Sequence, residues 1–321
     1  MTPKHKASRR LWPYLAVPAL AVLIAAVIYM GDFSPEDVGI GGSSGETLPG
    51  SQVDQSELAD SDIRPDPAEQ HEAAQAQLQS LLDEAVGDYL AERGDENLYA
   101  SIAVSDGEFA LDYAGEEQHD TASIVKVEIL GMLLRSYETV EEIPGWVIGD
   151  AEKMIQESDN DATNSILFGL LDGHATMREA HEVFGLEGTE PGEGERWGMT
   201  QTTAVDQLTL LEGVLYEGVL TAEQAELARE LMGGLADFQY WGVPAGAAEG
   251  EAVWMKNGWD TRDGLGGEWV VNSIGVIAGD TESPIMLSVL TGGSASQQEG
   301  IDMVEDLAEI AREVIDTDPL A

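Results

Sequence analysis

The sequence predicts an α+β domain whose one sheet takes strands from both ends of the domain, with helices inserted between them. Strand-like runs occur near the start and near the end of this region, at 98–104, 108–113, 251–257, 268–278 and 284–291. Several helical segments occupy about 150–235. Strands separated by so many helices share a sheet when the two ends of the domain come together, which leaves the helices as an insert.

Helices are also expected at both ends of the domain and after its first two strands. Residues 69–92 carry apolar side chains at helical spacing: Leu78, Leu81, Leu82, Ala85 and Tyr89. A strongly apolar helix is predicted over 123–137, and a closing amphipathic helix over about 296–315. Ser105-Asp106-Gly107 predicts a hairpin turn between the first two strands.

An uncharged run at 11–30 precedes the domain. Its 20 residues reach roughly 30 Å as a helix, the thickness of a bilayer core. The basic residues within 1–10 place that tail in the cytoplasm and the rest of the chain outside. A cleavable signal peptide is the alternative, but its apolar region is usually about 7–15 residues. We therefore expect a single-pass transmembrane anchor in the cell membrane.

Residues 31–68 are rich in Gly, Ser, Pro and acidic side chains. Such a segment buries too little apolar area to offset the entropy of ordering, so an acidic flexible linker is predicted. Residues 69–321 then form the extracytoplasmic domain. The chain contains no cysteine, which excludes disulfides, thiolate metal sites and cysteine nucleophiles.

The net charge of −46 is the most unusual bulk property. A field of this sign repels phosphate backbones, so nucleic acid is not an expected partner. An acidic surface adapted to high salt is the favoured explanation, because salt screens such repulsion; a specific cationic partner is the alternative. The five histidines have no metal-ligand spacing, so neither a metal nor another cofactor is expected. The sequence does not indicate an oligomeric state.

Three short motifs carry the candidate chemistry. Ser123 and Lys126 lie one helical turn apart, where a neutral lysine could take the serine proton without a histidine. Ser158-Asp159-Asn160 falls at a break between helical segments, and Lys256-Asn257-Gly258 ends a strand-like run. Each motif alone also has an ordinary structural explanation: a helix cap with a solvated lysine, a cap at a turn, and a hairpin turn.

The distribution of lysine favours the chemical interpretation. The chain holds only five lysines, and Lys4 and Lys6 precede the apolar run. Of Lys126, Lys153 and Lys256, two stand in the two motifs that need a lysine. Independent coincidence is a poor explanation for that placement.

In this order, the motifs resemble the S-x-x-K, S-D-N and K-T-G set of class A β-lactamases and penicillin-binding proteins. Residues 197–204 also resemble the Thr-rich opening of a later helix in that family. The resemblance covers about 69–321. It implies a β-lactamase/transpeptidase-like α+β fold, with an antiparallel sheet flanked by helices and a helical insert. The implied substrates are β-lactams or D-Ala-D-Ala-type peptides.

The resemblance also implies catalytic roles. Ser123 is the acylated nucleophile, Lys126 is its base, and Ser158 passes a proton to the leaving nitrogen. To act as a base, Lys126 must be neutral, a shift of a few units from a pKa of about 10.4. Burial and Lys256 favour that shift, whereas the acidic surface opposes it. The expected consequence is an alkaline or salt-dependent activity optimum.

The implied substrate-binding residues are Asn160, Lys256, Asn257, Gly258 and Trp259. Asn160 orients the substrate amide, and Lys256 attracts the substrate carboxylate. The backbone N–H groups of the nucleophile and of Trp259 form the oxyanion hole. Donors of this kind contribute roughly 2.7–4 kcal/mol each.

Three departures from the family pattern limit the prediction. The gap between the first two motifs is short, and Asn257 replaces the Thr of the third motif. The stretch 187–196 is too short for the loop that carries the deacylating Glu. A serine hydrolase or transpeptidase with doubtful deacylation is the first hypothesis. The second is a non-catalytic penicillin-binding or sensory ectodomain, and the third is an unrelated domain with chance motifs.

Overall fold

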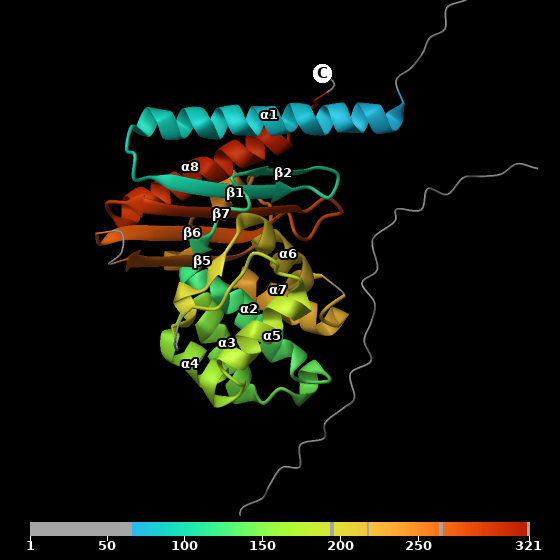
Figure 1. Cartoon of the computed structure of the whole chain (residues 1–321). Helices are drawn as coiled ribbons and strands as arrows, with labels where there is room; N and C mark the ends of the chain where they lie inside the picture. Colours follow the sequence, from blue (N-terminus) through green and yellow to red (C-terminus); the bar gives the residue numbers. More distant parts are fainter. Residues whose placement is uncertain (1–65, 193–195, 217, 263–265, 320–321) are drawn as a thin grey trace, which may run out of the picture. The chain divides into compact units, whose positions relative to one another are not determined.

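The computed structural model describes residues 66–192, 196–216, 218–262 and 266–319 (Figure 1). The predicted tail, the predicted anchor and all but the end of the predicted linker lie outside these residues. Among the described residues, no helix combines the length and the apolar character that a membrane crossing needs.

One five-stranded sheet is built from both ends of the domain, as predicted. Its strand order is β2-β1-β7-β6-β5, and every neighbouring pair is antiparallel. The strands are β1 (Tyr99–Ser105), β2 (Ala110–Tyr113), β5 (Val253–Arg262), β6 (Glu268–Ile277) and β7 (Ile285–Ser294). Strand β5 forms one edge of the sheet and extends five residues beyond its predicted end.

Two long helices cover one face of the sheet: α1 (Pro67–Arg93) and α8 (Gln297–Ile315) (Figure 1). The carboxylate of Asp66 caps the first turn of α1, and Gly94 ends the helix at a positive φ of 64°. Leu78, Leu82 and Val86 are fully buried, because their spacing of four places them on the face toward the sheet.

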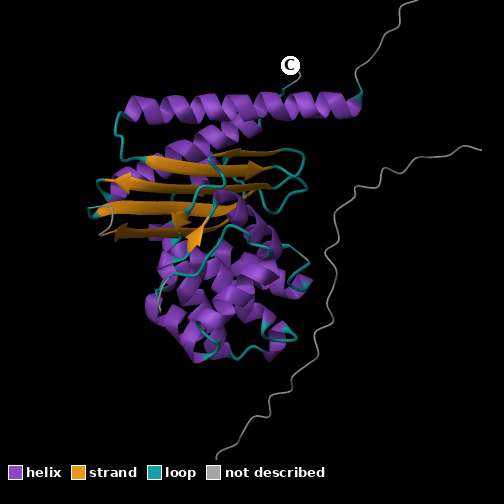
Figure 2. Ribbon diagram, viewed as in Figure 1, coloured by secondary structure: helices purple, strands orange, loops and turns teal. Residues whose placement is uncertain are grey.

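The opposite face of the sheet meets the helical insert (Figure 2). The insert contains α2 (Lys126–Arg135), α3 (Gly145–Gln156), α4 (Asn160–Gly169), α5 (His174–Phe184), α6 (Ala204–Leu215) and α7 (Ala222–Gly233). A small second sheet pairs β3 (His119–Asp120) with β4 (Gln201–Thr202). Short 3₁₀ turns complete the chain: η1 (Ala122–Val125), η2 (Val140–Glu142), η3 (Trp197–Met199), η4 (Asp237–Gln239) and η5 (Val243–Gly246).

Alternation along the strands divides the apolar interior into two cores. Ile102 and Val104 of β1 face the core beneath α1 and α8, whereas Ala103 faces the core of the helical insert. The edge strand β5 lies between the two cores, and its Lys256 and Gly258 face the insert side. On this side of the sheet, Lys256 contacts Ser158 of the insert, and Gly258 approaches the backbone of Ser123.

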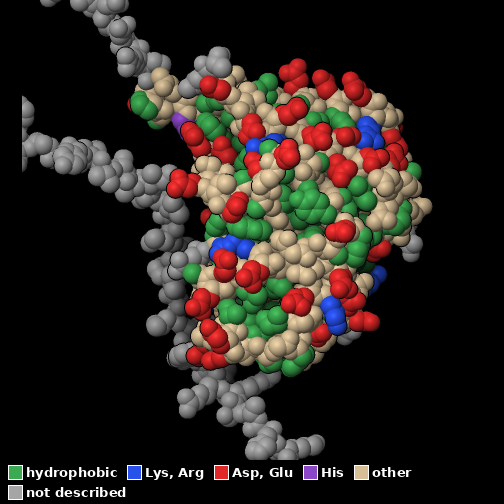
Figure 3. All heavy atoms as spheres, turned by 180° about the vertical axis from the view of Figure 1, so that it is seen from behind, with side chains coloured by type: hydrophobic (Ala, Val, Ile, Leu, Met, Phe, Trp, Pro, Cys, Tyr) green, Lys and Arg blue, Asp and Glu red, His purple; other side chains and the backbone are tan. Residues whose placement is uncertain are grey.

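Acidic side chains are spread over the visible surface, and Lys and Arg are few (Figure 3). Most of the recorded ion pairs are therefore made by a small number of arginines. Arg262 and Arg312 each bind two carboxylates among the described residues. Because Lys and Arg are scarce, the buried ones among the described residues, Lys126, Lys256 and Arg262, are the cations to examine for a role in the site.

Candidate active site

Ser123 lies on the 3₁₀ turn η1, one turn before helix α2 begins. The prediction of a helix starting at 123 is therefore corrected by three residues, and the side chain of Thr121 does not cap the turn. The turn is held from two sides. The backbone N–H of Thr121 donates to Thr200 O over 2.8 Å, and the amide of Asn272 on β6 donates to Asp120 O and Thr121 O.

Lys126 is fully buried at the start of α2. Its Nζ lies 2.6 Å from Ser158 O, 3.0 Å from Ser158 Oγ and 2.9 Å from Asn160 Oδ1. No hydrogen bond joins it to Ser123 among the described contacts. Burial lowers the pKa of Lys126 to about 7, although the negative charge of Asp159 opposes the shift. Near neutral pH, a large fraction of this lysine is a free amine.

The second motif forms the turn between α3 and α4. Ser158 has a positive φ of 59°, an unfavourable conformation for a residue with a Cβ. Asp159 accepts from the backbone N–H of Ala162 and so caps α4, which is the structural role expected of this residue type. The strained turn directs both oxygen atoms of Ser158 toward Lys126, and Asn160 opens the next helix beside them.

Lys256 approaches the same serine from strand β5. Its Nζ lies 3.1 Å from Ser158 Oγ and 2.8 Å from Asn257 O, and its side chain is fully buried. Burial and the nearby charge of Lys126 lower the pKa of Lys256 well below its usual value. One hydroxyl group therefore lies within hydrogen-bond distance of two buried lysines.

This geometry defines a proton path when Lys126 is neutral. A neutral amine has two N–H donors and one lone pair. The donors match the two carbonyl-type acceptors, Ser158 O and Asn160 Oδ1, and the lone pair can accept from the Ser158 hydroxyl. Lys256 can donate to that same hydroxyl oxygen. Ser158 is thus placed to exchange a proton with Lys126, as its predicted role requires.

Gly258 allows β5 to approach the nucleophile. A Cβ built on this residue would lie 2.7 Å from the backbone nitrogen of Ser123 and 2.7 Å from Thr121 O. Real Cβ atoms do not tolerate such distances, so only glycine permits this contact. Because β5 is an edge strand, part of its backbone remains unpaired beside Ser123. The two backbone N–H groups predicted to form an oxyanion hole belong to Ser123, at this contact, and to Trp259, the next residue of β5.

Asn257 is directed away from Ser123, because successive side chains of a strand alternate in direction. Its amide donates to Gln239 O over 2.7 Å and to Trp241 O over 3.0 Å, and its oxygen accepts from Ser273 Oγ over 2.6 Å. The side chain is fully buried. All of these contacts are structural, and none leads to the cavity described next.

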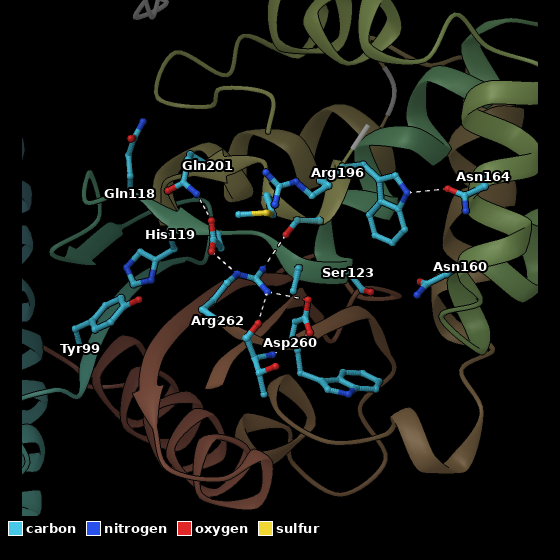
Figure 4. Close-up of a pocket in the computed structure, with 17 residues that line it drawn as sticks. Tyr99, Gln118, His119, Ser123, Asn160, Asn164, Arg196, Gln201, Asp260 and Arg262 are labelled. Atoms are coloured by element: carbon cyan, nitrogen blue, oxygen red, sulfur yellow. Dashed lines mark hydrogen bonds and ion pairs between the residues drawn. The ribbon is translucent and has the colours of Figure 1, made fainter. Parts of the chain in front are cut away.

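A cavity of about 1000 Å³ opens in front of Ser123 (Figure 4). Ser123, Asn160 and Trp259 line it, whereas Lys126, Ser158, Lys256 and Asn257 lie behind its surface. The Nδ2 group of Asn160 has no partner among the described residues, so it can donate to a ligand. The cavity extends from Ser123 toward Gln118, His119 and Tyr99 (Figure 4).

An ion-pair network that the sequence analysis did not foresee forms the floor of this cavity. Arg262 pairs with Asp120 and with Asp260, the latter over 2.8 Å, and donates to Gly198 O over 3.0 Å. Gln201 donates to the same Asp120 carboxylate. The network ties β5, β3, β4 and η3 together, and it leaves neither carboxylate of the cavity wall unpaired. The only signal in the sequence was the rarity of basic residues.

Trp197 is a second residue that the sequence analysis did not assign to the site. The ring centroid lies 5.0 Å from Nζ of Lys126, and Nε1 donates to Asn164 Oδ1 over 3.0 Å. Its stretch was expected to open a helix. That helix, α6, begins at Ala204 with Thr203 as its cap, and Trp197 belongs to the preceding turn η3. The indole covers Lys126 on the side of the cavity.

The loop at 187–196 carries no carboxylate at the nucleophile among its described residues. Glu190 pairs through its backbone with Gln201, and its side chain is exposed. Residues 193–195 lie outside the described part of the chain. The two described acids that line the cavity, Asp120 and Asp260, are both bound to Arg262.

Comparison with known proteins places this arrangement among characterised folds. A model of the β-lactamase enzyme family matches residues 150–315, slightly more than half of the chain. A search of curated protein sequences returns no match.

Solved structures match over most of the domain. A mutant of PBP-A, solved as an acyl-enzyme complex with penicillin G, is 19% identical, with 75% of this chain and 96% of that chain covered and a TM-score of 0.60. An ancestral class A β-lactamase is 21% identical, and the match covers 73% of this chain and 98% of that chain with a TM-score of 0.59. A β-lactamase from Desulfarculus baarsii DSM 2075 is 16% identical, and the match covers 77% of this chain and 99% of that chain, also with a TM-score of 0.59. At these identities the likeness shows the fold.

Proposed function

Because the chain belongs to the β-lactamase enzyme family, we propose that it is a serine acyl-transfer hydrolase that reacts through an acyl-enzyme on Ser123. The proposed substrates are β-lactams or D-Ala-D-Ala-type peptides. One observation carries the proposal: Ser158 Oγ lies between the buried amino groups of Lys126 and Lys256, at 3.0 and 3.1 Å, beside the serine that lines the cavity.

Acylation forms one bond and breaks another. The hydroxyl oxygen of Ser123 attacks the substrate carbonyl carbon. Its proton passes to the lone pair of the Lys126 amine, which turns from the Ser158 hydroxyl to accept it. The carbon–nitrogen bond then breaks, and Ser158 gives its proton to the leaving nitrogen. Ser158 recovers a proton from Lys126, which becomes neutral again, so no proton is lost or gained. The pKa of about 7 supports this role, because a base works best when its pKa lies near the working pH.

Two further groups complete the proposed site. Asn160 donates its free amide hydrogens to the substrate, while its oxygen remains bound to Lys126. The backbone nitrogen of Ser123, beside Gly258, stabilises the negative oxygen that forms on the carbonyl. Lys256 acts on Ser158 from behind the cavity wall, as a hydrogen-bond donor to the Ser158 hydroxyl, because its side chain is fully buried and does not line the cavity.

Hydrolysis of the acyl-enzyme is expected to be slow. Deacylation needs a base that activates water, and the two described carboxylates on the cavity wall are held by Arg262. The indole of Trp197 also covers Lys126, the other base at the site. The same observation favours a second candidate, a penicillin-binding sensory ectodomain in which a persistent adduct is the signal.

The surroundings of the domain are proposed from sequence. Residues 11–30 would anchor the chain in the cell membrane, with 1–10 in the cytoplasm and the enzyme domain outside. The net charge of −46 supports work at high salt, where exposed like charges are screened. Protease protection of the N-terminal tail in sealed right-side-out vesicles tests the orientation. Cleavage of the tail in such intact vesicles would contradict it.

A covalent labelling experiment tests the proposed chemistry. The full chain is incubated with a fluorescent penicillin in high salt, and intact mass is measured over time. We expect one adduct per chain, absent in Ser123→Ala and present in Ser165→Ala, a serine outside the cavity. Turnover of a chromogenic cephalosporin then separates the two candidates. Absence of any adduct on the folded wild-type chain would overturn the acyl-transfer proposal.

A further inference from the structure

A second cavity, of about 660 Å³, lies on the other side of the edge strand β5. It is bounded by η4 and the segment after it, by Trp259 of β5 and by the first turns of α8. Trp259 also lines the cavity of Ser123, so the two cavities meet at this residue. Gly258, the residue next to it, is the one that touches the backbone of Ser123. Adjacent Cα atoms are about 3.8 Å apart, so the wall that the two cavities share begins one residue from the contact with Ser123.

Aromatic rings dominate the wall of the second cavity. Phe238, Trp241 and Trp259 line it, and the two indoles pack edge to face with ring centroids 5.7 Å apart. Phe238 is 65% exposed, which is unusual for so large an apolar side chain. The exposed ring faces of an aromatic cluster carry partial negative charge, which attracts cations.

A carboxylate completes the cavity. Gln297, Ile301 and Glu305 are spaced by four residues on α8, so they share the face that lines the cavity. The only described contact of the Glu305 carboxylate is a long hydrogen bond, 3.4 Å, from the backbone N–H of Gly242. No Lys, Arg or His is among the described residues that line this cavity. The wall is therefore negative and contains no cation of its own.

We propose that this cavity is a subsite for an ammonium group carried by the molecule that acylates Ser123. The inference rests on the proposed function, because it assigns the charge of part of the substrate. Glu305 repels a carboxylate at this position, and the aromatic faces favour a soft, weakly hydrated cation over a small metal ion. A cationic substituent of a β-lactam, or an amine-bearing side chain of a peptide, has the required chemistry.

Direct binding is measured first, on the full chain with Ser123→Ala, so that no acylation is needed. The probe is tetramethylammonium chloride, titrated by ligand-observed NMR in high potassium chloride, which screens attraction to the acidic surface. We expect saturable binding that weakens about tenfold in Glu305→Gln and about fivefold in Phe238→Ala. Glu309→Gln removes an exposed charge one turn along the same helix and is the matched control, with no change expected.

The second measurement links the subsite to the reaction. Two cephalosporins share a nucleus and an acyl group, and one carries a quaternary ammonium where the other carries a neutral substituent. We expect the cationic compound to acylate the wild-type chain about five- to tenfold faster, and this ratio to approach one in Glu305→Gln.

The outcomes separate the two proposals. Acylation by both compounds at equal rates, or a ratio unaffected by Glu305→Gln, overturns the subsite and leaves acyl transfer intact. Non-saturable binding of tetramethylammonium, or equal weakening by Glu305→Gln and Glu309→Gln, also overturns it, because the attraction is then general. No acylation by either compound overturns the proposed function itself, and with it the assignment of this cavity to a substrate.

Discussion

Nζ of Lys126 lies 2.6 Å from the carbonyl oxygen of Ser158 and 3.0 Å from its hydroxyl oxygen. The lysine that begins helix α2 is therefore bound to the turn between α3 and α4, not to the serine three residues before it. The arrangement couples two motifs that are 32 residues apart. It also fixes the amine in a dry position, which is the physical cause of its lowered pKa.

The first prediction concerns pH. Burial lowers the pKa of Lys126 to about 7, so the amine is protonated below that pH and cannot accept the Ser123 proton. The rate constant of acylation should fall about tenfold for each pH unit below 7 and reach a plateau above it. Stopped-flow labelling with a fluorescent penicillin at constant high salt gives the profile. A rate that is flat from pH 5 to 8 would remove Lys126 as the base.

This prediction sharpens the expectation from sequence. An alkaline or salt-dependent optimum was expected, because burial and Lys256 lower the pKa of Lys126 from about 10.4 whereas the acidic surface opposes the shift. The buried position of Lys126 brings the rise to neutral pH instead. The sequence indicates only the direction of the shift, because the extent of burial depends on residues from α4 and η3 that are distant in the chain.

The second prediction concerns Gly258. Alanine at this position places a Cβ 2.7 Å from the backbone nitrogen of Ser123, so either β5 or the turn η1 must move. A displaced oxyanion donor lowers acylation by about 100-fold or more. Gly87→Ala is the control, because a Cβ at that helical glycine meets no atom within 4 Å. Equal labelling rates for the Gly258→Ala and Gly87→Ala variants would show that the approach of β5 to Ser123 is unimportant.

The third prediction concerns Asn257. Its amide satisfies the carbonyls of Gln239 and Trp241 and the hydroxyl of Ser273. Asn257→Ala leaves these buried groups unpaired, at a cost of about 1–3 kcal/mol for each group that stays unsatisfied. Thermal unfolding should shift to a clearly lower temperature, whereas the exposed Asn97→Ala should not shift it. An unchanged melting temperature with weakened substrate binding would instead support the role implied by the family resemblance.

The sequence predicted the helices and strands more completely than it predicted the residues that line the cavity of Ser123. The helix at Pro67–Arg93 and all five strands were predictable, because helical spacing and strand-like runs are local properties. Lys126 and Lys256 were predictable through the scarcity of lysine. The pairing of Arg262 with Asp120 joins residues 142 positions apart, and no local pattern indicates it. Trp197 was predicted only to belong to the opening of a helix, because no residue near it in the sequence indicates contact with a lysine.

The direction of the Asn257 side chain was missed for a related reason. The motif was expected to end its strand, but β5 continues to Arg262. Within a continuous strand, alternation sends Lys256 and Gly258 to one side and Asn257 to the other. The resemblance supplied the residue types of the motif, whereas the length of the strand decides which of them can reach a ligand.

The last prediction concerns Trp197, which separates Lys126 from the cavity. Its ring lies 5.0 Å from the amine and is held by the hydrogen bond to Asn164. In Trp197→Ala, water can reach Lys126 beside the acylated serine. At alkaline pH, where the amine stays neutral, Lys126 can then serve as the base for hydrolysis. The acyl-enzyme should disappear at least roughly tenfold faster, because excluded water no longer limits the step. A chase of the labelled protein followed by intact mass gives this lifetime.

Two comparisons make the Trp197 experiment decisive. Trp146→Ala removes an exposed indole of α3 that does not line the cavity, and should leave the adduct lifetime at the wild-type value. In Trp197→Ala, the loss of burial should also raise the pKa of Lys126, since burial is the largest cause of its lowering. The acylation profile would then move to higher pH. A wild-type adduct lifetime together with an unmoved profile would mean that the indole neither excludes water nor shields the lysine.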